Sequence, residues 1–181
     1  IKLNTKNVYS KGMFENVCLA IKVALDLNID KKTIQKTLPL LSFEGRFQYL
    51  NKGKIKNKLH INEIIMIDGA HATADAKNLA TYLKSIKVPK YGIWAMTKNK
   101  DPDLFIKQLK GVFKKVVTMP IENEPNSVSA NKLYKIAIKN KLKVEKSYNF
   151  ANAISKISSK EKKLIVCFGS LYNCGNILNK N

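Results

Sequence analysis

The sequence predicts an α/β fold in which a mostly parallel sheet carries helices on both faces. From residue 63 onward, short apolar runs typical of buried strands alternate with segments of helical period, and this alternation occurs five times. Right-handed crossover connections make a parallel sheet the accessible topology for such repeats. With 181 residues and 45% hydrophobic content, the chain can bury one substantial core.

Two helices are predicted before this alternation begins. Apolar residues recur with a helical period over 13–27, and Asp30 begins a second short helix that ends near Leu38, before Pro39. Two helices alone do not bury a core, so we expect them to be part of a larger architecture.

A domain boundary is predicted near residue 50. Residues 1–50 are interpreted as the end of a preceding domain with its linker, and residues 51–181 as the α/β domain. The stretch 50–63 is rich in Lys, Asn and Gly, and it predicts a strand or hairpin around the boundary.

Each repeat then follows from its own pattern. The first strand is the apolar run 64–67, and the helix after it, 73–86, places Ala76, Leu79 and Leu83 on one face. In the second unit, strand 91–96 is followed by helix 101–110. In the third, strand 115–119 is followed by a helix that Ser127 or Ser129 caps and that ends at 140. The last two units are strand 143–146 with helix 150–157, and strand 164–168 with helix 171–178.

The formal net charge of +20 raises the question of a nucleic-acid partner, since such a field attracts phosphate backbones. The lysines, however, run through nearly every polar segment and do not form one helix face interleaved with aromatic residues. This distribution indicates a compositional bias of the whole chain. It predicts weak nonspecific polyanion binding and no specific nucleic-acid partner.

Membrane insertion and disulfide or zinc scaffolds are not predicted. No run of eighteen apolar residues occurs and the N-terminal stretch lacks the apolar core of a signal peptide, so we expect a cytoplasmic protein without membrane contact. Cys18, Cys167 and Cys174 are widely spaced, and the chain has two histidines. We expect reduced, packed thiols and no metal site within this chain.

Arg46 is the one arginine among 33 strongly basic residues. Its guanidinium is a planar, permanently charged fork that binds phosphate or carboxylate with two parallel hydrogen bonds, which a lysine ammonium does not provide. We interpret Arg46 as a phosphate ligand, and the alternative is a solvated surface charge.

Asp68 and His71 follow the first strand of the alternation, where ligands of parallel sheets bind. A carboxylate at a strand end accepts hydrogen bonds from a ribose diol, and His71 is placed to contact a base. Asp68 starting a turn is an equally weighted alternative. The sequence contains neither a Gly-x-x-x-x-Gly-Lys-Ser/Thr motif nor a Gly-x-Gly-x-x-Gly motif, so phosphates are not held by such loops of this chain.

Four motifs together resemble one known family, the folylpolyglutamate synthases and dihydrofolate synthases of the Mur ligase group. In order they are Gly45-Arg46-Phe47-Gln48, Asp68-Gly69-Ala70-His71, Lys100-Asp101 and Gly169-Ser170-Leu171-Tyr172. The segment 12–24 is similar to the helix that closes the family's central ATPase domain. Residues from about 60 onward are similar to its Rossmann-like C-terminal domain.

The resemblance implies roles for particular residues. Arg46, Asp68 and His71 correspond to residues that help bind ATP from the C-terminal side, with Arg46 as a phosphate clamp. Lys100 and Ser170 become candidates for substrate contact, although a serine at that position is more often a helix N-cap. No residue is identified as a catalytic acid, base or nucleophile.

The family chemistry is ATP-dependent amide formation, in which a pteroate or folate carboxyl is phosphorylated and then attacked by the amine of glutamate. The resemblance implies ATP and Mg²⁺ as cofactors, with dihydropteroate or folate and glutamate as substrates. The family's P-loop, its magnesium ligands and its folate cleft correspond to sequence upstream of this chain. A separate chain carrying that ATPase domain is therefore a possible partner, and the isolated chain is expected to be inactive.

Two departures from the family pattern bear on the site. The Asp-Gly-Ala-His motif continues with Ala72-Thr73 where the family has Asn-Pro, and the family's Asp-Lys-Asp is Asn99-Lys100-Asp101. We therefore keep two alternatives open, a non-catalytic remnant or binding module and, with charge as its only support, a basic polyanion-binding protein.

Overall fold

A six-stranded sheet forms the centre of the computed structural model, which describes all residues 1–181. The strand order is β1-β2-β6-β3-β4-β5, in which the last strand of the chain lies between β2 and β3. The strands are β1 (Gln48–Tyr49), β2 (Glu63–Asp68), β3 (Lys90–Trp94), β4 (Lys115–Thr118), β5 (Val144–Lys146) and β6 (Lys163–Phe168). The predicted parallel sheet is confirmed, with five parallel strands and β1 antiparallel at one edge.

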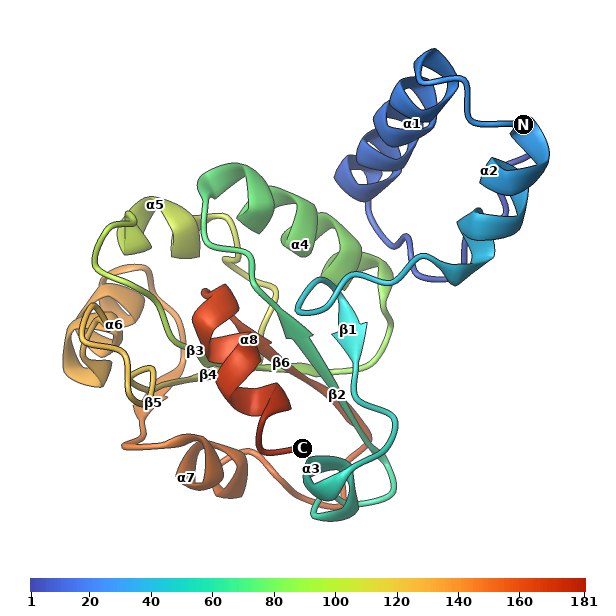
Figure 1. Cartoon of the computed structure of the whole chain (residues 1–181). Coiled ribbons are helices and arrows are strands. Elements are labelled where there is room, and N and C mark those ends of the chain that lie inside the picture. The colour runs from blue at the N-terminus through green and yellow to red at the C-terminus, as the bar shows by residue number, and fades with distance from the viewer.

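Helices cover both faces of this sheet, as predicted (Figure 1). One face carries α4 (Thr73–Ser85), α5 (Pro102–Lys107) and α6 (Ala130–Lys139). The other carries α3 (Lys54–Asn57), α7 (Phe150–Ser155) and α8 (Leu171–Leu178). Successive strand residues therefore enter different cores: Met66 packs toward α4, whereas Ile65 and Ile67 pack on the opposite side.

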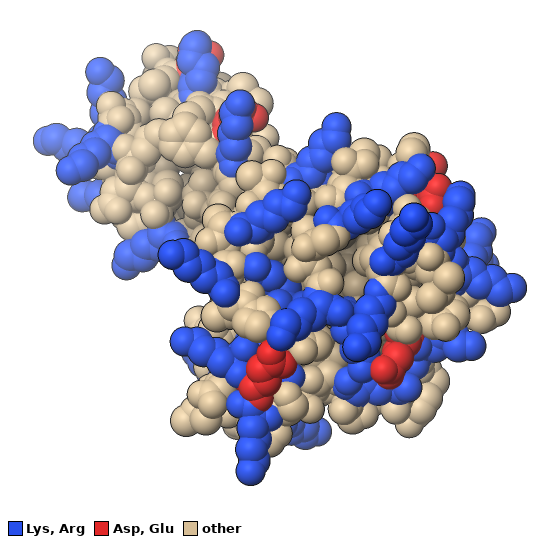
Figure 2. Space-filling model, turned by 180° about the vertical axis from the view of Figure 1, so that it is seen from behind, with Lys and Arg blue, Asp and Glu red and all other residues tan.

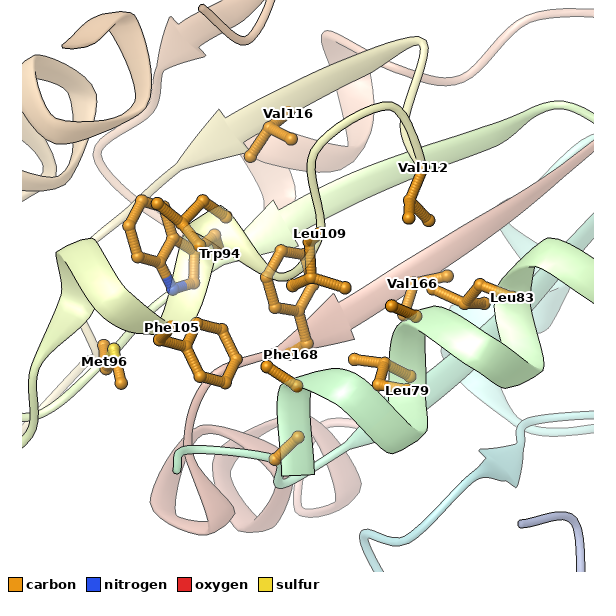
Figure 3. Packing of buried hydrophobic residues seen from close by; sticks show 14 of the residues in the cluster. Leu79, Leu83, Trp94, Met96, Phe105, Leu109, Val112, Val116, Val166 and Phe168 are labelled. Carbon is orange, nitrogen blue, oxygen red and sulfur yellow. The ribbon is translucent and has the colours of Figure 1, made fainter. Parts of the chain in front are cut away.

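The core on the α4 side is built around three aromatic rings. Trp94 and Phe168, at the ends of β3 and β6, stack with Phe105 of α5 at ring-centroid distances of 6.1 to 6.4 Å. Figure 3 shows these rings gathered between the sheet and the helices, with Leu79 and Leu83 of α4 beside them. This packing fixes the carboxyl ends of β3 and β6 against α5.

The N-terminal helices form a small unit beside the sheet. It consists of α1 (Lys11–Asp26), α2 (Lys31–Thr37) and a 3₁₀ turn (Leu38–Leu40), and it projects from the α/β part near α4 and β1 (Figure 1). Tyr9, just before α1, packs against Tyr49 of β1 and Tyr82 of α4, with centroid distances of 5.8 and 5.7 Å. These contacts hold the helical unit against the α/β part.

The strand or hairpin predicted over 50–63 is wrong, because this stretch contains the one-turn helix α3. The turn is held by the far end of the chain. The Lys54 N–H donates to the Asn181 backbone oxygen over 2.8 Å, and the Ile55 N–H donates to the Asn181 side chain over 3.1 Å. The buried Ile55 and Leu59 then fill the core beneath.

None of the helices has both the length and the apolar content needed to cross a membrane. The lysines are spread widely: in Figure 2 they stand out over the helical unit and over the α/β part alike, with few acidic side chains between them.

Candidate functional site

Arg46 lies on a tight loop that leads into β1 and is fastened to the end of β2. Gly45 has a φ of 67°, which glycine adopts without strain, and its carbonyl oxygen accepts a 2.6 Å hydrogen bond from Gly69 N–H. Phe47 also has a positive φ, 46°, and its side chain is buried in the core below. This conformation directs Phe47 inward and leaves Arg46 beside a cavity.

Asp68, the last residue of β2, fastens the loop through its carboxylate. One oxygen accepts a 2.8 Å hydrogen bond from Phe47 N–H, and the other accepts a 2.7 Å hydrogen bond from Ala70 N–H. The hydrogen bond to Ala70 N–H is the kind that an aspartate makes when it starts a turn. The alternative that Asp68 starts a turn therefore describes part of the role of this residue. The residue is 1% exposed, yet it borders the same cavity as Arg46.

Burial dominates the acidity of Asp68. Removing the carboxylate from water raises its pKa to about 6, against the opposing effects of the two backbone hydrogen bonds and the charge of Arg46. The guanidinium is near enough to affect this carboxyl group, but it forms no ion pair with it. The guanidinium of Arg46, beside the cavity, therefore has no ion-pair partner in the protein.

The cavity has a volume of about 420 Å³ and lies between the helical unit and the α/β part. The residues around it come from four places: the start of α1, the Arg46 loop, the end of β2 and the first half of α4. They are Ser10, Gly12, Met13, Glu15, Asn16, Phe43, Arg46, Phe47, Asp68, Asp75 and Asn78. A smaller cavity of about 210 Å³ is also lined by Arg46, together with residues that include Tyr9, Gln48 and Tyr49.

Sequence reasoning did not identify the cavity residues from α1 and α4. Ser10 could have been recognised in the sequence as a helix N-cap, because a serine is common at that position. In the structure it is the N-cap of α1 and accepts a 3.2 Å hydrogen bond from Met13 N–H. Asn78 gave no signal in the sequence, since an amide on an amphipathic helix looks like any solvated position. Its side chain lies close enough to α1 that a β-carbon on Gly12 would come within 2.9 Å of it.

His71 lies beside this cavity at the entrance to α4 and is not part of its lining. Its Nδ1 is 2.7 Å from the Gly69 carbonyl oxygen and 4.0 Å from Asp75 Oδ2. The Asp75 carboxylate also accepts hydrogen bonds from the His71 and Ala72 backbone N–H groups. These contacts start the helix without the Asn-Pro pair of the family motif.

Lys100 and Ser170 are not brought to the Arg46 cavity. Lys100 is half-buried on the loop after β3. Ser170 occupies the N-cap position of α8 and is 3% exposed, but its hydroxyl makes no capping hydrogen bond. Both follow the carboxyl ends of parallel strands, as predicted, but neither lines that cavity. Leu171, the residue after Ser170, lies close to Gly45 of the Arg46 loop.

No group of three His, Cys, Asp or Glu side chains is arranged to hold a metal ion. What the geometry offers is a half-buried guanidinium without an ion-pair partner, beside a mostly polar cavity that Glu15, Asp68 and Asp75 also line.

Comparison with known proteins places the chain in a family. The family model for the dihydrofolate synthetase C-terminal domain matches residues 51–180. No curated protein matches the sequence.

Three solved structures illustrate the similarity of fold. Folylpolyglutamate synthase of Mycobacterium tuberculosis, complexed with ADP and AMPPCP, aligns with a TM-score of 0.82 at 19% identity, over 98% of this chain and 41% of that protein. E. coli FolC in complex with DHPP and ADP aligns with a TM-score of 0.76 at 17% identity, over 96% and 39%. A bifunctional folylpolyglutamate synthase/dihydrofolate synthase with Mn, AMPPNP and L-glutamate bound aligns with a TM-score of 0.76 at 18% identity, over 98% and 40%.

The chain thus spans about two fifths of the length of these proteins. At such identities the structures establish the fold, and the family model, which covers most of the chain, establishes the relationship. The chain belongs to the family of dihydrofolate synthetase C-terminal domains.

Proposed function

We propose that this chain is the C-terminal part of an ATP-dependent ligase that joins glutamate to dihydropteroate or folates through an acyl phosphate. In this proposal residues 1–50 are the end of the central ATPase domain with its linker, and residues 51–181 are the C-terminal domain. The family, the fold and the unpaired guanidinium at the cavity support it.

The observation that carries the proposal is the state of Arg46. Its guanidinium is half-buried, takes part in no ion pair, and borders a cavity of about 420 Å³ between the two parts of the chain. A permanent positive charge in such a place favours an anion with two acceptor oxygens, and a nucleotide phosphate has that geometry. In phosphoryl transfer such a clamp stabilises charge that develops on the transferred group.

Asp68 and His71 have supporting roles in this proposal. Asp68 keeps the Arg46 loop in place through Phe47 N–H and borders the cavity where a ribose would lie. His71 stands at the outer rim, next to the start of α4. Lys100 and Ser170 remain proposed substrate contacts on the strand-end rim.

In this proposal, magnesium binding and the P-loop belong to the ATPase part of the ligase and not to residues 1–181. Magnesium, when bound, neutralises phosphate charge, and no three His, Cys, Asp or Glu side chains of this chain are grouped to hold it. The P-loop is likewise absent from these residues. The proposal therefore requires the ATPase part, joined to this chain or supplied as a second chain, and it expects no ligase activity from residues 1–181 alone.

The test is reconstitution. The chain is co-expressed with the P-loop part of a folylpolyglutamate synthase, and ATP-dependent incorporation of labelled glutamate into dihydropteroate and tetrahydrofolate is measured. We expect incorporation only when both parts are present. Activity of the chain alone, or none from any pairing that forms a stable complex, would contradict the proposal.

Arg46→Lys in that assembly keeps the charge and removes the planar fork. We expect kcat to fall about tenfold or more, with the melting temperature unchanged. The matched control is the reverse exchange Lys160→Arg, at an exposed position before β6, which is expected to leave kcat unaltered. Equal kinetics for the two variants would remove Arg46 from the role of clamp.

A further inference from the structure

A separate cavity of about 220 Å³ lies on the sheet face that carries α3, α7 and α8. It is formed where α3, the start of α7 and the residue Lys180 beyond α8 come together, close to the C-terminus in Figure 1. It shares no lining residue with either cavity at Arg46. An inference about this cavity is therefore independent of the proposed ligase function.

Part of the wall of this cavity is apolar. Ile55 and Phe150 are more than nine-tenths buried and belong to the core on this face, and Ile154 packs against them. Ala151, on the exposed side of α7, borders the opening. The cavity thus offers a ring or a branched aliphatic group contact with apolar side chains, and its volume limits the ligand to about one ring.

The rim carries mostly positive charge. Lys54, Lys58 and Lys180 line the opening, and Glu122 is the one acidic residue among them. Glu122 is already engaged: it pairs with Lys180, which holds the pKa of its carboxyl below the usual value, and it accepts a hydrogen bond from Phe150 N–H. Its charge is therefore balanced within the protein.

Lys54 and Lys58 are not balanced in this way. Neither forms an ion pair with an acidic side chain. Lys54 begins α3, Lys58 is its C-cap, and both line the cavity. A ligand complementary to this cavity combines a compact apolar body with a negative charge.

We propose that this cavity is a binding site for a small organic anion, an aromatic or branched aliphatic carboxylate of about the size of benzoate. The apolar body lies against Phe150, Ile154 and Ile55, and the carboxylate lies between the ammonium groups of Lys54 and Lys58. Apolar burial holds the body, and the two cations select the charge.

The test uses sodium benzoate as the probe, titrated into the full chain and followed by amide and methyl NMR. We expect saturable shifts centred on Ile55, Ala151 and Ile154. Benzyl alcohol lacks the charge and acetate lacks the ring, and both are expected to bind at least about fivefold more weakly. Equal binding of benzyl alcohol, or shifts spread over unrelated lysines, would overturn the proposal.

Variants separate this site from the general basic charge. The double substitution Lys54→Gln/Lys58→Gln is expected to weaken benzoate binding about fivefold. Its control, Lys31→Gln/Lys32→Gln, removes the same charge from exposed positions at the start of α2 and is expected to leave binding unchanged. Equal weakening in both variants would mean attraction by net charge, and the site would be rejected.

Ala151→Leu fills the opening from an exposed helical position, so the fold is not at risk. We expect it to abolish the saturable shifts. Unchanged benzoate binding in this variant would place the probe elsewhere and overturn the assignment.

Discussion

The two ends of strand β2 each carry a buried carboxylate, and their surroundings differ. Glu63 begins the strand and Asp68 ends it, and neither is more than 1% exposed. The pKa of Glu63 lies below its usual value, whereas the pKa of Asp68 is raised to about 6. Burial raises both, so the difference comes from the groups that face each carboxylate.

Glu63 is fully satisfied by the protein. Its oxygens accept hydrogen bonds from Ser158 Oγ, Ser159 N–H and His60 N–H, at 2.7, 2.8 and 3.0 Å. Lys163 Nζ, also buried, lies 3.6 Å away. Burial is the largest single influence on this pKa, and these contacts together outweigh it.

Asp68 has two backbone hydrogen bonds and no ion pair. Arg46, whose charge lowers the pKa of this carboxyl, borders the cavity and forms no ion pair within the protein. The amino end of β2 is therefore electrostatically complete, and the carboxyl end is not. This difference agrees with the general rule that parallel sheets bind ligands at their carboxyl ends.

The largest expected effect is at the amino end of β2, where Glu63 and Lys163 lie. Lys163→Met removes the cation and leaves the Glu63 charge buried, so we expect the free energy of unfolding to fall by about 4 kcal/mol at neutral pH. Urea denaturation measures it. The double variant Glu63→Gln/Lys163→Met is expected to recover much of the loss. A fall below about 1 kcal/mol in the single variant would show that the two ends do not differ in this way.

The pH dependence of stability tests the sign of the difference. Asp68 has a folded pKa of about 6, above the usual 3.8, so between these values the folded state binds more protons than the unfolded state. Its contribution is present at low pH and is lost as pH rises toward about 6, by about 3 kcal/mol at most. Glu63 acts in the opposite sense, and its contribution is lost as pH falls below about 4.5.

The contribution of Asp68 is isolated by comparing the unsubstituted chain with Asp68→Asn. The free energy of unfolding of both is measured from about pH 4 to about pH 7. We expect the unsubstituted chain to lose stability relative to the variant as pH rises. A difference that stays flat would mean that Asp68 titrates normally, and the contrast between the two ends would disappear.

The smallest expected stability effect is at Arg46. Arg46→Ala removes a cation without an ion-pair partner, so we expect the free energy of unfolding to change by less than about 0.5 kcal/mol. The pKa of the Asp68 carboxyl should rise, because the charge of Arg46 lowers it. A carbon-detected NMR titration measures this pKa. A loss above about 1.5 kcal/mol would mean that Arg46 is structural.

Local pattern was sufficient to predict most elements. The helix expected over 171–178 matches α8 from end to end, and the strand expected over 64–67 is β2 with one residue more at each side. Apolar period and capping residues such as Ser129 act within a few residues, so they can be recognised in sequence.

The errors and omissions arise from contacts between distant residues. α3 depends on Asn181, at the other end of the chain, and β1 is only two residues long and pairs through Gln48 and Tyr49 with β2. The place of β6 between β2 and β3 is likewise set by pairing across the whole domain. No local period encodes such partners, because their spacing in sequence is unrelated to their contact in space.

The candidate site divides in the same way. Sequence by itself determined the α/β class, the strand ends at which polar groups gather, and the identity of Arg46 as the single guanidinium. The tertiary structure decided that Asp68 fastens the Arg46 loop and that α1 supplies the opposite wall of the cavity. It also decided that Lys100 and Ser170 do not line that cavity. The physical reason is that residue type fixes what a side chain can bind, whereas folding alone fixes which charges are buried, paired or left free.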